Sequence, residues 1–160
     1  MNENQIRSIY IETFCHATES LEKVKAAVLN LCGLGAEALP EDFILEESRV
    51  YGGYGNDIVI LKITSTTDAL SALIFTNLSE RMLQQDKIAI FKNFEKQTDG
   101  KSSLFIRFNK QAAYQGNLTL TNEDPVKVQI QFELGFTRKK ERPEKLKEFC
   151  LNTHIIEQGD

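Results

Sequence analysis

The chain has 160 residues, 41% of them hydrophobic, and carries a formal net charge of −4 at pH 7. This length fits a single domain over residues 1–160 that buries most of the surface its unfolded form exposes. The acidic balance excludes a protein wrapped in nucleic acid on all sides, because phosphate contacts need many Lys and Arg side chains. Any RNA site should therefore be local.

The apolar runs of the chain are short. None approaches the roughly 18 to 20 residues that a membrane-spanning helix needs, and the first five residues are polar. We therefore expect a cytoplasmic protein with no membrane partner. Its cysteines, Cys15, Cys32 and Cys150, are odd in number and widely spaced, which does not fit a secreted disulfide framework. Reduced, packed thiols are expected instead.

The first predicted element is a strand over residues 7–14, where apolar and other side chains alternate. One of its faces would carry Ile9 and Ile11. The opposite face would carry Tyr10 and Phe14. This strand should therefore place two aromatic rings on the side of the sheet that its isoleucines do not face.

An amphipathic helix should follow the first strand. Thr18 is expected to cap it, with Glu19 near its positive end. Apolar residues then recur at spacings of three and four: Leu21, Val24, Val28 and Leu31. The helix should end at Gly33. Residues 34–42 contain small residues and a proline, so a connection is expected there.

Two strands and a second helix are predicted next. The strands should cover residues 43–51 and 57–64. The stretch Gly52-Gly53-Tyr54-Gly55-Asn56 between them supplies residues that accept positive φ, so the pair should form a hairpin. The helix should begin at Thr67 or Asp68. Its buried stripe is predicted to consist of Leu70, Leu73, Ile74, Leu78 and Met82.

The second half should open with a short helical piece over residues 87–94 and a turn over residues 98–100. Strands are predicted over residues 104–108, 118–121 and 126–132. The last of these alternates cleanly and places Val126, Val128, Ile130 and Phe132 on one face. Its other face is polar, as in a sheet with one wet face. Pro143 should then open a final helix that packs through Leu146, Phe149 and Cys150.

The predicted order is β-α-β-β-α-β-β-β-α, a single α+β domain in which helices cover one face of a mostly antiparallel sheet. Its core should span residues 6–134, and a basic segment with a helix should occupy residues 136–156. The uncovered face would present aromatic, basic and amide groups: Tyr10, Phe14, Phe105, Arg107, Lys127 and Gln129. Single-stranded RNA stacks on surfaces of this kind. The alternative is that the three rings pack under a loop or a partner subunit.

Two further groups of residues are candidates for RNA contacts. In the segment Lys110-Gln111-Ala112-Ala113-Tyr114-Gln115-Gly116, Lys110 could meet a phosphate, Gln111 a base edge or phosphate, and Tyr114 could stack on a base. The alternative is a short helical turn in which the alanines and Tyr114 pack and Lys110 is solvated. The second group is the basic cluster Arg138, Lys139, Lys140, Arg142, Lys145 and Lys147, which Glu141, Glu144 and Glu148 dilute.

Three motifs occur in order along the chain: Phe14-Cys15-His16-Ala17-Thr18-Glu19, Gly52-x-Tyr54-Gly55-Asn56-x-Ile58, and Arg107-x-x-Lys110-Gln111-Ala112-Ala113-Tyr114-x-Gly116. Through these motifs the chain resembles an archaeal RNA-binding-domain family labelled predicted exosome subunit, from about Ile6 to about Phe132. The resemblance implies a fold similar to that of ribosomal protein L5. It also implies RNA association rather than an established reaction.

The same resemblance points to particular residues without giving them chemical roles. They are His16, Thr18, Glu19, Gly52, Tyr54, Gly55, Asn56, Lys110, Gln111 and Tyr114. The chain departs from the family pattern after Asn56, where Asp57 stands in place of a proline. This departure changes the expected turn and adds a negative charge that disfavours phosphate.

Catalytic and metal sites have little support in the residues. The chain has only two histidines, His16 and His154, and no Cys-x-x-Cys spacing that would indicate zinc. The glycine-rich hairpin lacks the Gly-Lys-Ser/Thr ending of a phosphate-binding loop. The carboxylates Asp86, Asp99 and Asp124 occupy turn-like positions, where capping is their usual role. We therefore expect no enzyme, no metal and no cofactor.

The leading hypothesis is an RNA-binding accessory protein without catalysis of its own, associated with the archaeal exosome or with RNA processing. The alternative is a protein–protein interaction module, either a subunit of a larger assembly or a homodimer, that does not bind RNA directly. A third possibility is an RNA-processing hydrolase, which metal-dependent nuclease activity abolished by changing His16 would reveal. The expected partners are thus RNA, exosome or other protein subunits, or a second copy of the chain.

Overall fold

An antiparallel sheet with strand order β2-β3-β1-β5-β4 forms the centre of the molecule. The computed structural model describes residues 6–51, 53 and 56–159. Within this part of the chain the strands are β1 (Ile6–Cys15), β2 (Leu45–Tyr51), β3 (Asp57–Ser65), β4 (Ser103–Phe108) and β5 (Val126–Phe132). The helices are α1 (Leu21–Cys32), α2 (Asp68–Arg81), α3 (Gln84–Lys92), the 3-10 helix η2 (Phe94–Gln97), α4 (Lys110–Tyr114) and α5 (Arg142–Asn152).

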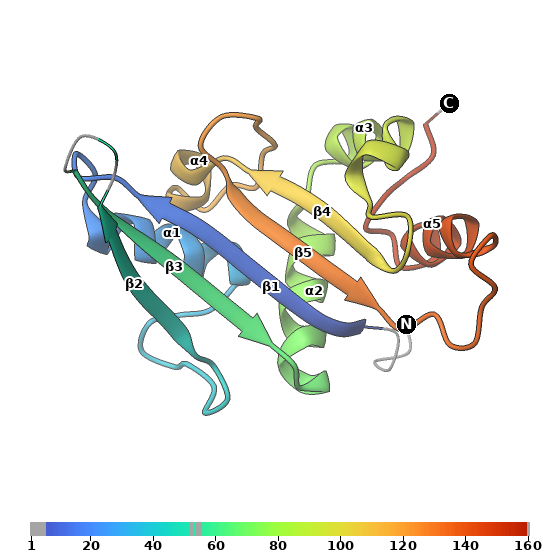
Figure 1. Cartoon of the computed structure of the whole chain (residues 1–160), viewed down its shortest axis with the longest axis horizontal. Helices are drawn as coiled ribbons and strands as arrows, with labels where there is room; N and C mark the ends of the chain where they lie inside the picture. Colours follow the sequence, from blue (N-terminus) through green and yellow to red (C-terminus); the bar gives the residue numbers. More distant parts are fainter. Residues whose placement is uncertain (1–5, 52, 54–55, 160) are drawn as a thin grey trace.

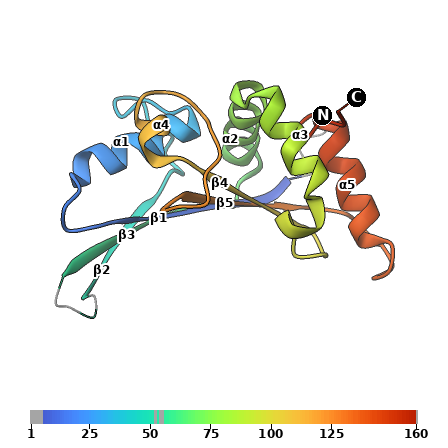
Figure 2. The same cartoon turned by 90° about the horizontal axis from the view of Figure 1, so that it is seen from above.

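The helices cover one face of the sheet and leave the other face open (Figure 1). Figure 2 shows α1, α2 and α4 on the same side of the strands, with α3 and α5 at one end of the molecule. The predicted α+β class, with helices on one face of an antiparallel sheet, is therefore confirmed. Across residues 6–51, 53 and 56–159, no helix is both long enough and apolar enough to cross a bilayer.

Alternation along the strands builds the core between the sheet and the helices. In β1, Ile9 and Ile11 are almost completely buried, as predicted. In β5, all four apolar residues of the alternating set are buried, and Phe132 meets Phe75 of α2 edge to face, with ring centroids 5.9 Å apart. A fully buried side chain of this size stabilises the fold by about 1.5–3 kcal/mol relative to exposure. Cys15, Cys32 and Cys150 are buried free thiols.

The start of α1 differs from the prediction, because Ser20 rather than Thr18 caps the helix. The Ser20 hydroxyl accepts a hydrogen bond from the backbone N–H of Lys23. Thr18 is exposed in the turn before the helix. At the other end Gly33 has φ 75° and closes the helix, and a Cβ there would lie 2.4 Å from the Asn77 side chain. Both its conformation and its neighbour therefore require glycine.

The second helix is confirmed with one error in its buried stripe. Thr67 caps α2 through a hydrogen bond from the N–H of Leu70, as expected. Leu73, however, is 48% exposed. The buried stripe of α2 includes Ser71 and Phe75 in addition to the predicted positions 70, 74 and 78. With 3.6 residues per turn, position 73 lies beyond the edge of that stripe.

The strand predicted over residues 118–121 does not form. Leu120 makes only an isolated bridge to Phe108, and Leu118 is buried in the core. The backbone of this segment instead bonds the end of β4, with Asn109 donating to the Thr119 carbonyl at 2.7 Å. Its apolar residues were therefore a sign of burial rather than of strand pairing. The helical piece predicted over residues 87–94 corresponds to α3 and η2, and the helical turn that was the alternative for residues 110–116 forms as α4.

Candidate functional site

The open face of the sheet brings one group of the predicted contact residues together. Directly opposite residues on β1, β5 and β4 form rows across it. One row consists of Tyr10, Gln129 and Phe105. The next consists of Glu12, Lys127 and Arg107. The predicted phasing of these strands is therefore confirmed, and aromatic and basic side chains lie in adjacent rows. We refer to this surface as the open face.

The aromatic side chains of the open face are partly exposed. Phe14 is 36% exposed and Phe105 is 37% exposed. A shallow hollow of about 110 Å³ lies between the two rows and is lined by Tyr10, Phe105 and Arg107 among others. Because a water in the liquid takes up about 30 Å³, this hollow has room for only a few waters. A planar ligand would therefore lie over the surface rather than enter it.

Hydrogen bonding and charge keep the rings of the open face in place. The Tyr10 hydroxyl donates to a Glu12 carboxylate oxygen at 2.8 Å. Burial and then this hydrogen bond raise the pKa of Tyr10 to about 12, so its phenol stays neutral near neutral pH. The Lys127 ammonium lies 5.9 Å from the centre of the Phe14 ring, within cation–π range. Neither Arg107 nor Lys127 forms an ion pair with another described residue.

The first and last family motifs meet in a cluster at the far end of β1. We call it the Lys110 cluster, and it consists of His16, Glu19, Lys110 and Asp124. The Lys110 ammonium donates to the Phe14 carbonyl at 2.6 Å, to both carboxylate oxygens of Glu19 at 3.0 and 3.2 Å, and to Asp124 at 3.0 Å. Glu19 also accepts from the backbone N–H of His16 at 3.1 Å. These bonds join the end of β1 to the start of α4 and to the loop before β5.

The Lys110 cluster engages the ammonium that was expected to meet a phosphate. Lys110 is only 9% exposed, and its three N–H donors face four protein acceptors. The predicted alternative, a short helical turn, is right for the backbone but wrong for a solvated Lys110. Lys110 begins α4, which packs against α1, and its side chain reaches the end of β1, which places its ammonium among carboxylates. Its position indicates a structural ion pair.

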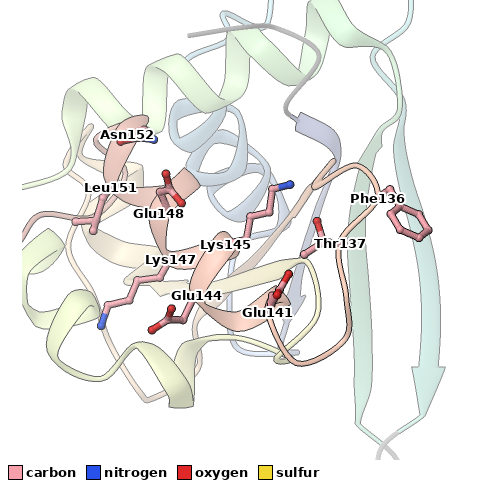
Figure 3. A pocket seen from close by; sticks show the side chains of 9 residues that line it. All are labelled: Phe136, Thr137, Glu141, Glu144, Lys145, Lys147, Glu148, Leu151 and Asn152. Atoms are coloured by element: carbon pink, nitrogen blue, oxygen red, sulfur yellow. The ribbon is translucent and has the colours of Figure 1, made fainter.

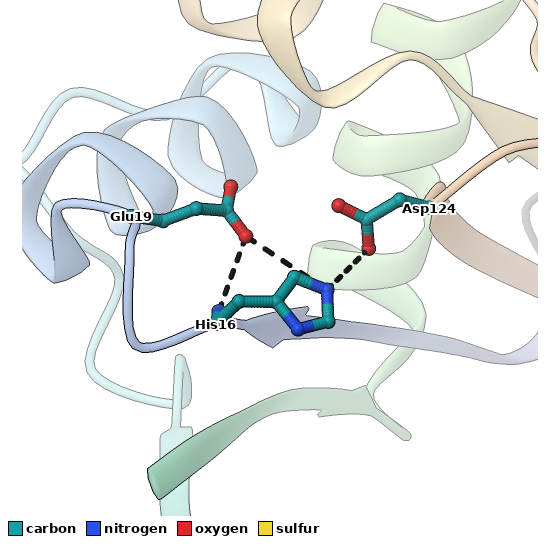
Figure 4. Close-up of side chains that lie close together, drawn as sticks. All are labelled: His16, Glu19 and Asp124. Atoms are coloured by element: carbon teal, nitrogen blue, oxygen red, sulfur yellow. Dashed lines mark hydrogen bonds and ion pairs between the residues drawn. The ribbon is translucent and has the colours of Figure 1, made fainter. Parts of the chain in front are cut away.

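Asp124 is the residue of this cluster that sequence reasoning missed. Its Oδ1 lies 3.0 Å from His16 Nε2 (Figure 4), although 108 residues separate the two. Burial alone would raise the pKa of Asp124, but hydrogen bonds from His16 and Lys110 outweigh it and lower that pKa. Asp124 was expected only as a turn residue, and its φ of 43° agrees with a turn. No local signal connects it to His16.

The cluster also contains a set of potential metal ligands. One donor atom each from His16, Glu19 and Asp124 lie within 4.8 Å of one another. Imidazole and carboxylate are the donors that several divalent ions accept in proteins. The Lys110 ammonium, however, already lies 3.0 Å from both carboxylates and supplies positive charge there. The two carboxylates of this potential metal site are thus already arranged around the Lys110 ammonium.

Two other predicted residues lie on the helix side of the sheet, away from the open face. Tyr114 of α4 is 42% exposed, and the Lys23 ammonium lies 5.9 Å from the centre of its ring. Together with the exposed Gln111 it lines a hollow of about 430 Å³ between α4 and the start of α1. We call this the α4 hollow. The carboxylates of Glu19, Glu123 and Asp124 also line it and outnumber the ammonium groups of Lys23 and Lys110, which disfavours phosphate.

Residues of the hairpin motif mostly fall outside the described part of the chain. Gly52, Tyr54 and Gly55 are among the residues that the structure does not describe. Asn56 is exposed and directly precedes β3. The strands on either side pair as predicted, with Tyr51 opposite Asp57. The hairpin is thus confirmed by its strands, and the role of its turn stays a prediction.

The basic cluster lies in the connection between β5 and α5 and in the first turns of α5. Arg138, Lys139, Lys140 and Arg142 are all exposed. Phe136, which the sequence reasoning did not single out, is fully exposed at 103%. Figure 3 shows its ring pointing away from the side chains of α5. A phenylalanine shortly before three basic residues was the available sequence signal.

Comparison with known proteins shows where this chain has relatives. A family model described as RNA binding matches residues 8–132. RNA-binding protein PAB1135 from Pyrococcus abyssi is 31% identical over 138 residues, which cover 86% of this chain and 88% of that protein. The matched region contains the open face and the Lys110 cluster and ends with β5.

Two solved structures share the fold over nearly their whole length. Protein AF2318 from Archaeglobus fulgidus is 28% identical, with a TM-score of 0.72, and the match covers 93% of this chain and 99% of that one. Mth689 from Methanothermobacter thermautotrophicus also has a TM-score of 0.72, at 20% identity, and covers 93% and 98% of the two chains. The latter likeness concerns the fold alone. The similarity to ribosomal protein L5 stays a prediction.

Proposed function

The chain belongs to the RNA-binding family, and from this premise we propose that it is an accessory protein that holds single-stranded RNA on its open face and catalyses no reaction itself. The observation that carries the proposal is the pair of adjacent rows, with Tyr10 and Phe105 in one and Lys127 and Arg107 in the other. Bases would stack on the first row while phosphates meet the second. This arrangement supports binding without sequence readout.

The energies of such contacts are sufficient for a useful affinity. Stacking of a base on an aromatic side chain contributes about 1–3 kcal/mol. Phosphate contacts to Arg107 and Lys127 would add a term that weakens as salt rises. Gln129 lies between the two rings in its row; its Nε2 donates to Ser103 Oγ at 3.2 Å, and its Oε1 can accept from a base edge. A few nucleotides would therefore bind through several modest contacts rather than one strong one.

The proposed accessory role, without catalysis, is supported by the side chains that the open face presents. The open face carries neither His16 nor His154, the chain's two histidines. Its Glu12 is engaged by the Tyr10 hydroxyl and lies 3.9 Å from the Lys62 ammonium. An open face of this kind presents RNA to another protein, which fits the link to an RNA-degrading assembly that the family resemblance implies. RNA cleavage would then belong to the partner.

The test is fluorescence anisotropy of short labelled RNAs across a salt series. The double variant Arg107→Ala with Lys127→Ala should reduce the slope of log K against log salt by about 0.7 for each phosphate that is no longer neutralised. The control Lys92→Ala with Lys96→Ala removes the same charge from exposed positions in α3 and η2 and should keep the slope. Equal slopes for the two double variants would exclude the open face as the phosphate site.

A second candidate, self-association through the same face, is favoured by its apolar end. There Phe14 lies opposite Ile60, and the 41%-exposed Val50 lies opposite Ile58. A homodimer that buried this surface would take the rings away from RNA. Mass measured in solution over a range of concentrations, with and without RNA, decides between the two. A stable dimer that RNA does not dissociate would support the second candidate.

A further inference from the structure

The connection after β5 presents one aromatic ring to solvent from an ordered turn. Leu134 is buried, whereas Phe136 two residues later is 103% exposed. Between them Gly135 has φ 67°, which turns the chain outward. The Thr137 hydroxyl donates to the Leu134 carbonyl at 2.9 Å and closes this turn. Phe136 is therefore held at a corner of the chain, with its ring outside the hydrophobic core.

Positive charge follows the ring closely. Arg138, Lys139, Lys140 and Arg142 are exposed, and none forms an ion pair with a residue in the described ranges 6–51, 53 and 56–159. The Glu141 N–H donates to the Arg138 carbonyl at 2.9 Å and forms a second turn. We refer to residues 135–142 as the basic loop. Its four cations outnumber its single carboxylate, Glu141.

The basic loop lies where an RNA on the open face would continue. Figures 1 and 2 place the connection from β5 to α5 at one end of the molecule, and in Figure 2 the start of α5 reaches past the sheet on the side that the helices leave open. On the α5 side, a hollow of about 520 Å³ beside the loop is lined by Phe136, by three carboxylates (Glu141, Glu144 and Glu148) and by two ammonium groups (Lys145 and Lys147). Because the carboxylates outnumber the ammonium groups, phosphate is disfavoured within the hollow, and a nucleic acid would follow the outer side of the loop.

We propose that the basic loop is a second RNA contact, in which Phe136 stacks on an unpaired base while Arg138, Lys139, Lys140 and Arg142 meet the neighbouring phosphates. This inference rests on the proposed function, because it extends the RNA from the open face to the loop. The loop lies outside residues 8–132, so the family match does not account for it. An exposed ring beside four cations is complementary to a single strand, which offers bases and phosphates in alternation. An apolar protein surface would leave those cations without partners.

A tryptophan at position 136 gives a direct readout, because the chain contains no tryptophan. In Phe136→Trp, titration with a short single-stranded RNA should quench the indole emission as a base stacks on it. An oligonucleotide of the same length without bases should bind through its phosphates with little quenching. The matched control is Tyr51→Trp, which places the same reporter at an 80%-exposed aromatic position on β2. Its emission should not change.

The affinity of two variants completes the test. Phe136→Ala should weaken RNA binding about tenfold, which lies within the range measured for removal of one stacking ring. Replacing the four cations with Ala should flatten the salt dependence by about 0.7 in log–log slope for each phosphate that is no longer neutralised. Both variants should keep the wild-type urea midpoint, because these side chains are exposed. If a variant had both a weaker RNA affinity and a lowered urea midpoint, unfolding would explain the loss of binding. Affinities are therefore compared only under conditions in which each variant is fully folded.

Different negative results would contradict the loop contact and the proposed RNA binding. If the wild-type protein binds RNA and neither the Phe136 nor the four-cation variant changes that binding, the loop contact is wrong and the open face stands. If the wild-type protein binds no RNA even at low salt, both proposals are wrong. A change in the emission of Phe136→Trp that follows protein concentration in the absence of RNA would show that the ring contacts a second protein copy instead.

Discussion

The open face and the Lys110 cluster contain the same kinds of side chain but use them in opposite ways. In the Lys110 cluster, a cation lies among carboxylates and a carbonyl, with every donor engaged. On the open face, Glu12 lies opposite Lys127, but its carboxylate accepts from the Tyr10 hydroxyl, and no described carboxylate forms an ion pair with Arg107 or Lys127. The difference shows that a basic residue is available to a ligand only if the fold has not already neutralised it.

The energetic consequences of this difference are large. Breaking a buried ion pair by removing one partner costs about 3–5 kcal/mol, because a charge remains without compensation. Removing an exposed, unpaired cation changes stability by about 0.5 kcal/mol or less. The Lys110 cluster should therefore control folding and the open face should control binding. Variants in the two regions separate these roles.

The largest expected effect is that of Lys110→Met. Methionine retains much of the length of the stem but leaves Glu19 and Asp124 without the Lys110 ammonium. Because these carboxylates are 28% and 46% exposed, the free energy of unfolding should fall by about 2–3 kcal/mol, less than for a fully buried pair. Urea denaturation measures it. RNA binding of the folded variant should keep the wild-type salt slope, because protein acceptors already engage the Lys110 ammonium.

Two outcomes would contradict the structural role of the Lys110 cluster. A Lys110→Met protein as stable as wild type would show that the cluster is not a structural ion pair. A reduced salt slope would return Lys110 to the RNA contacts. Adding Glu19→Gln should remove part of the defect, because one uncompensated charge disappears and the two changes are therefore not additive.

On the open face, Phe105→Ala should have its main effect on binding. Loss of one stacking ring should weaken RNA affinity by about 1–3 kcal/mol. Leu73→Ala is the matched control, since it removes an exposed apolar side chain from α2 on the helix side. Anisotropy at constant salt compares the two variants. An equal loss of affinity in both would mean that the effect does not depend on the open face.

The pH dependence of stability in Asp124→Asn tests how far charge stabilises the Lys110 cluster. The pKa of Asp124 is lowered in the fold, so its ionised form contributes stability above the unfolded pKa, and that contribution is lost as pH falls through the folded pKa. The wild-type advantage over Asp124→Asn should thus be largest at neutral pH and should disappear in strong acid. Asparagine is chosen because it tolerates the positive φ at this position. A pH-independent difference would show that the carboxylate charge is not involved.

The smallest expected effect is spectroscopic and concerns Tyr10. Its pKa of about 12 is raised above the ordinary value of 10.0, so its stabilising contribution is present below pH 10 and is lost as pH rises toward 12. In an ultraviolet titration, the latest tyrosine ionisation of the folded protein should be absent from Tyr10→Phe. If Tyr10→Phe instead loses an ionisation near pH 10 and keeps the latest one, burial and the Glu12 bond do not raise the pKa of Tyr10.

The sequence predicted the parts of this molecule that follow from local periodicity. Alternation in β1 and β5 was enough to place Tyr10, Phe105 and Lys127 on one open face, since each strand has only two faces. The same reasoning could not show that Lys110 is buried. Its partners Glu19 and Asp124 lie 91 and 14 residues away, and the packing of α4 against α1 brings Lys110 to Glu19. Residues 118–121 were misassigned for a similar reason, because burial of Leu118 resembles the pattern of a strand.

RNA should lie on the open face, and photocrosslinking with RNA that contains 4-thiouridine tests this central claim most directly. Trypsin separates the relevant rings, because it cuts after Lys101, Arg107 and Lys110. Mass spectrometry should find crosslinks at Phe105, in the peptide 102–107, and at Tyr10. An excess of unlabelled RNA should reduce both crosslinks. Crosslinks confined to Tyr114, in the peptide 111–127, would place the RNA in the α4 hollow and contradict the claim.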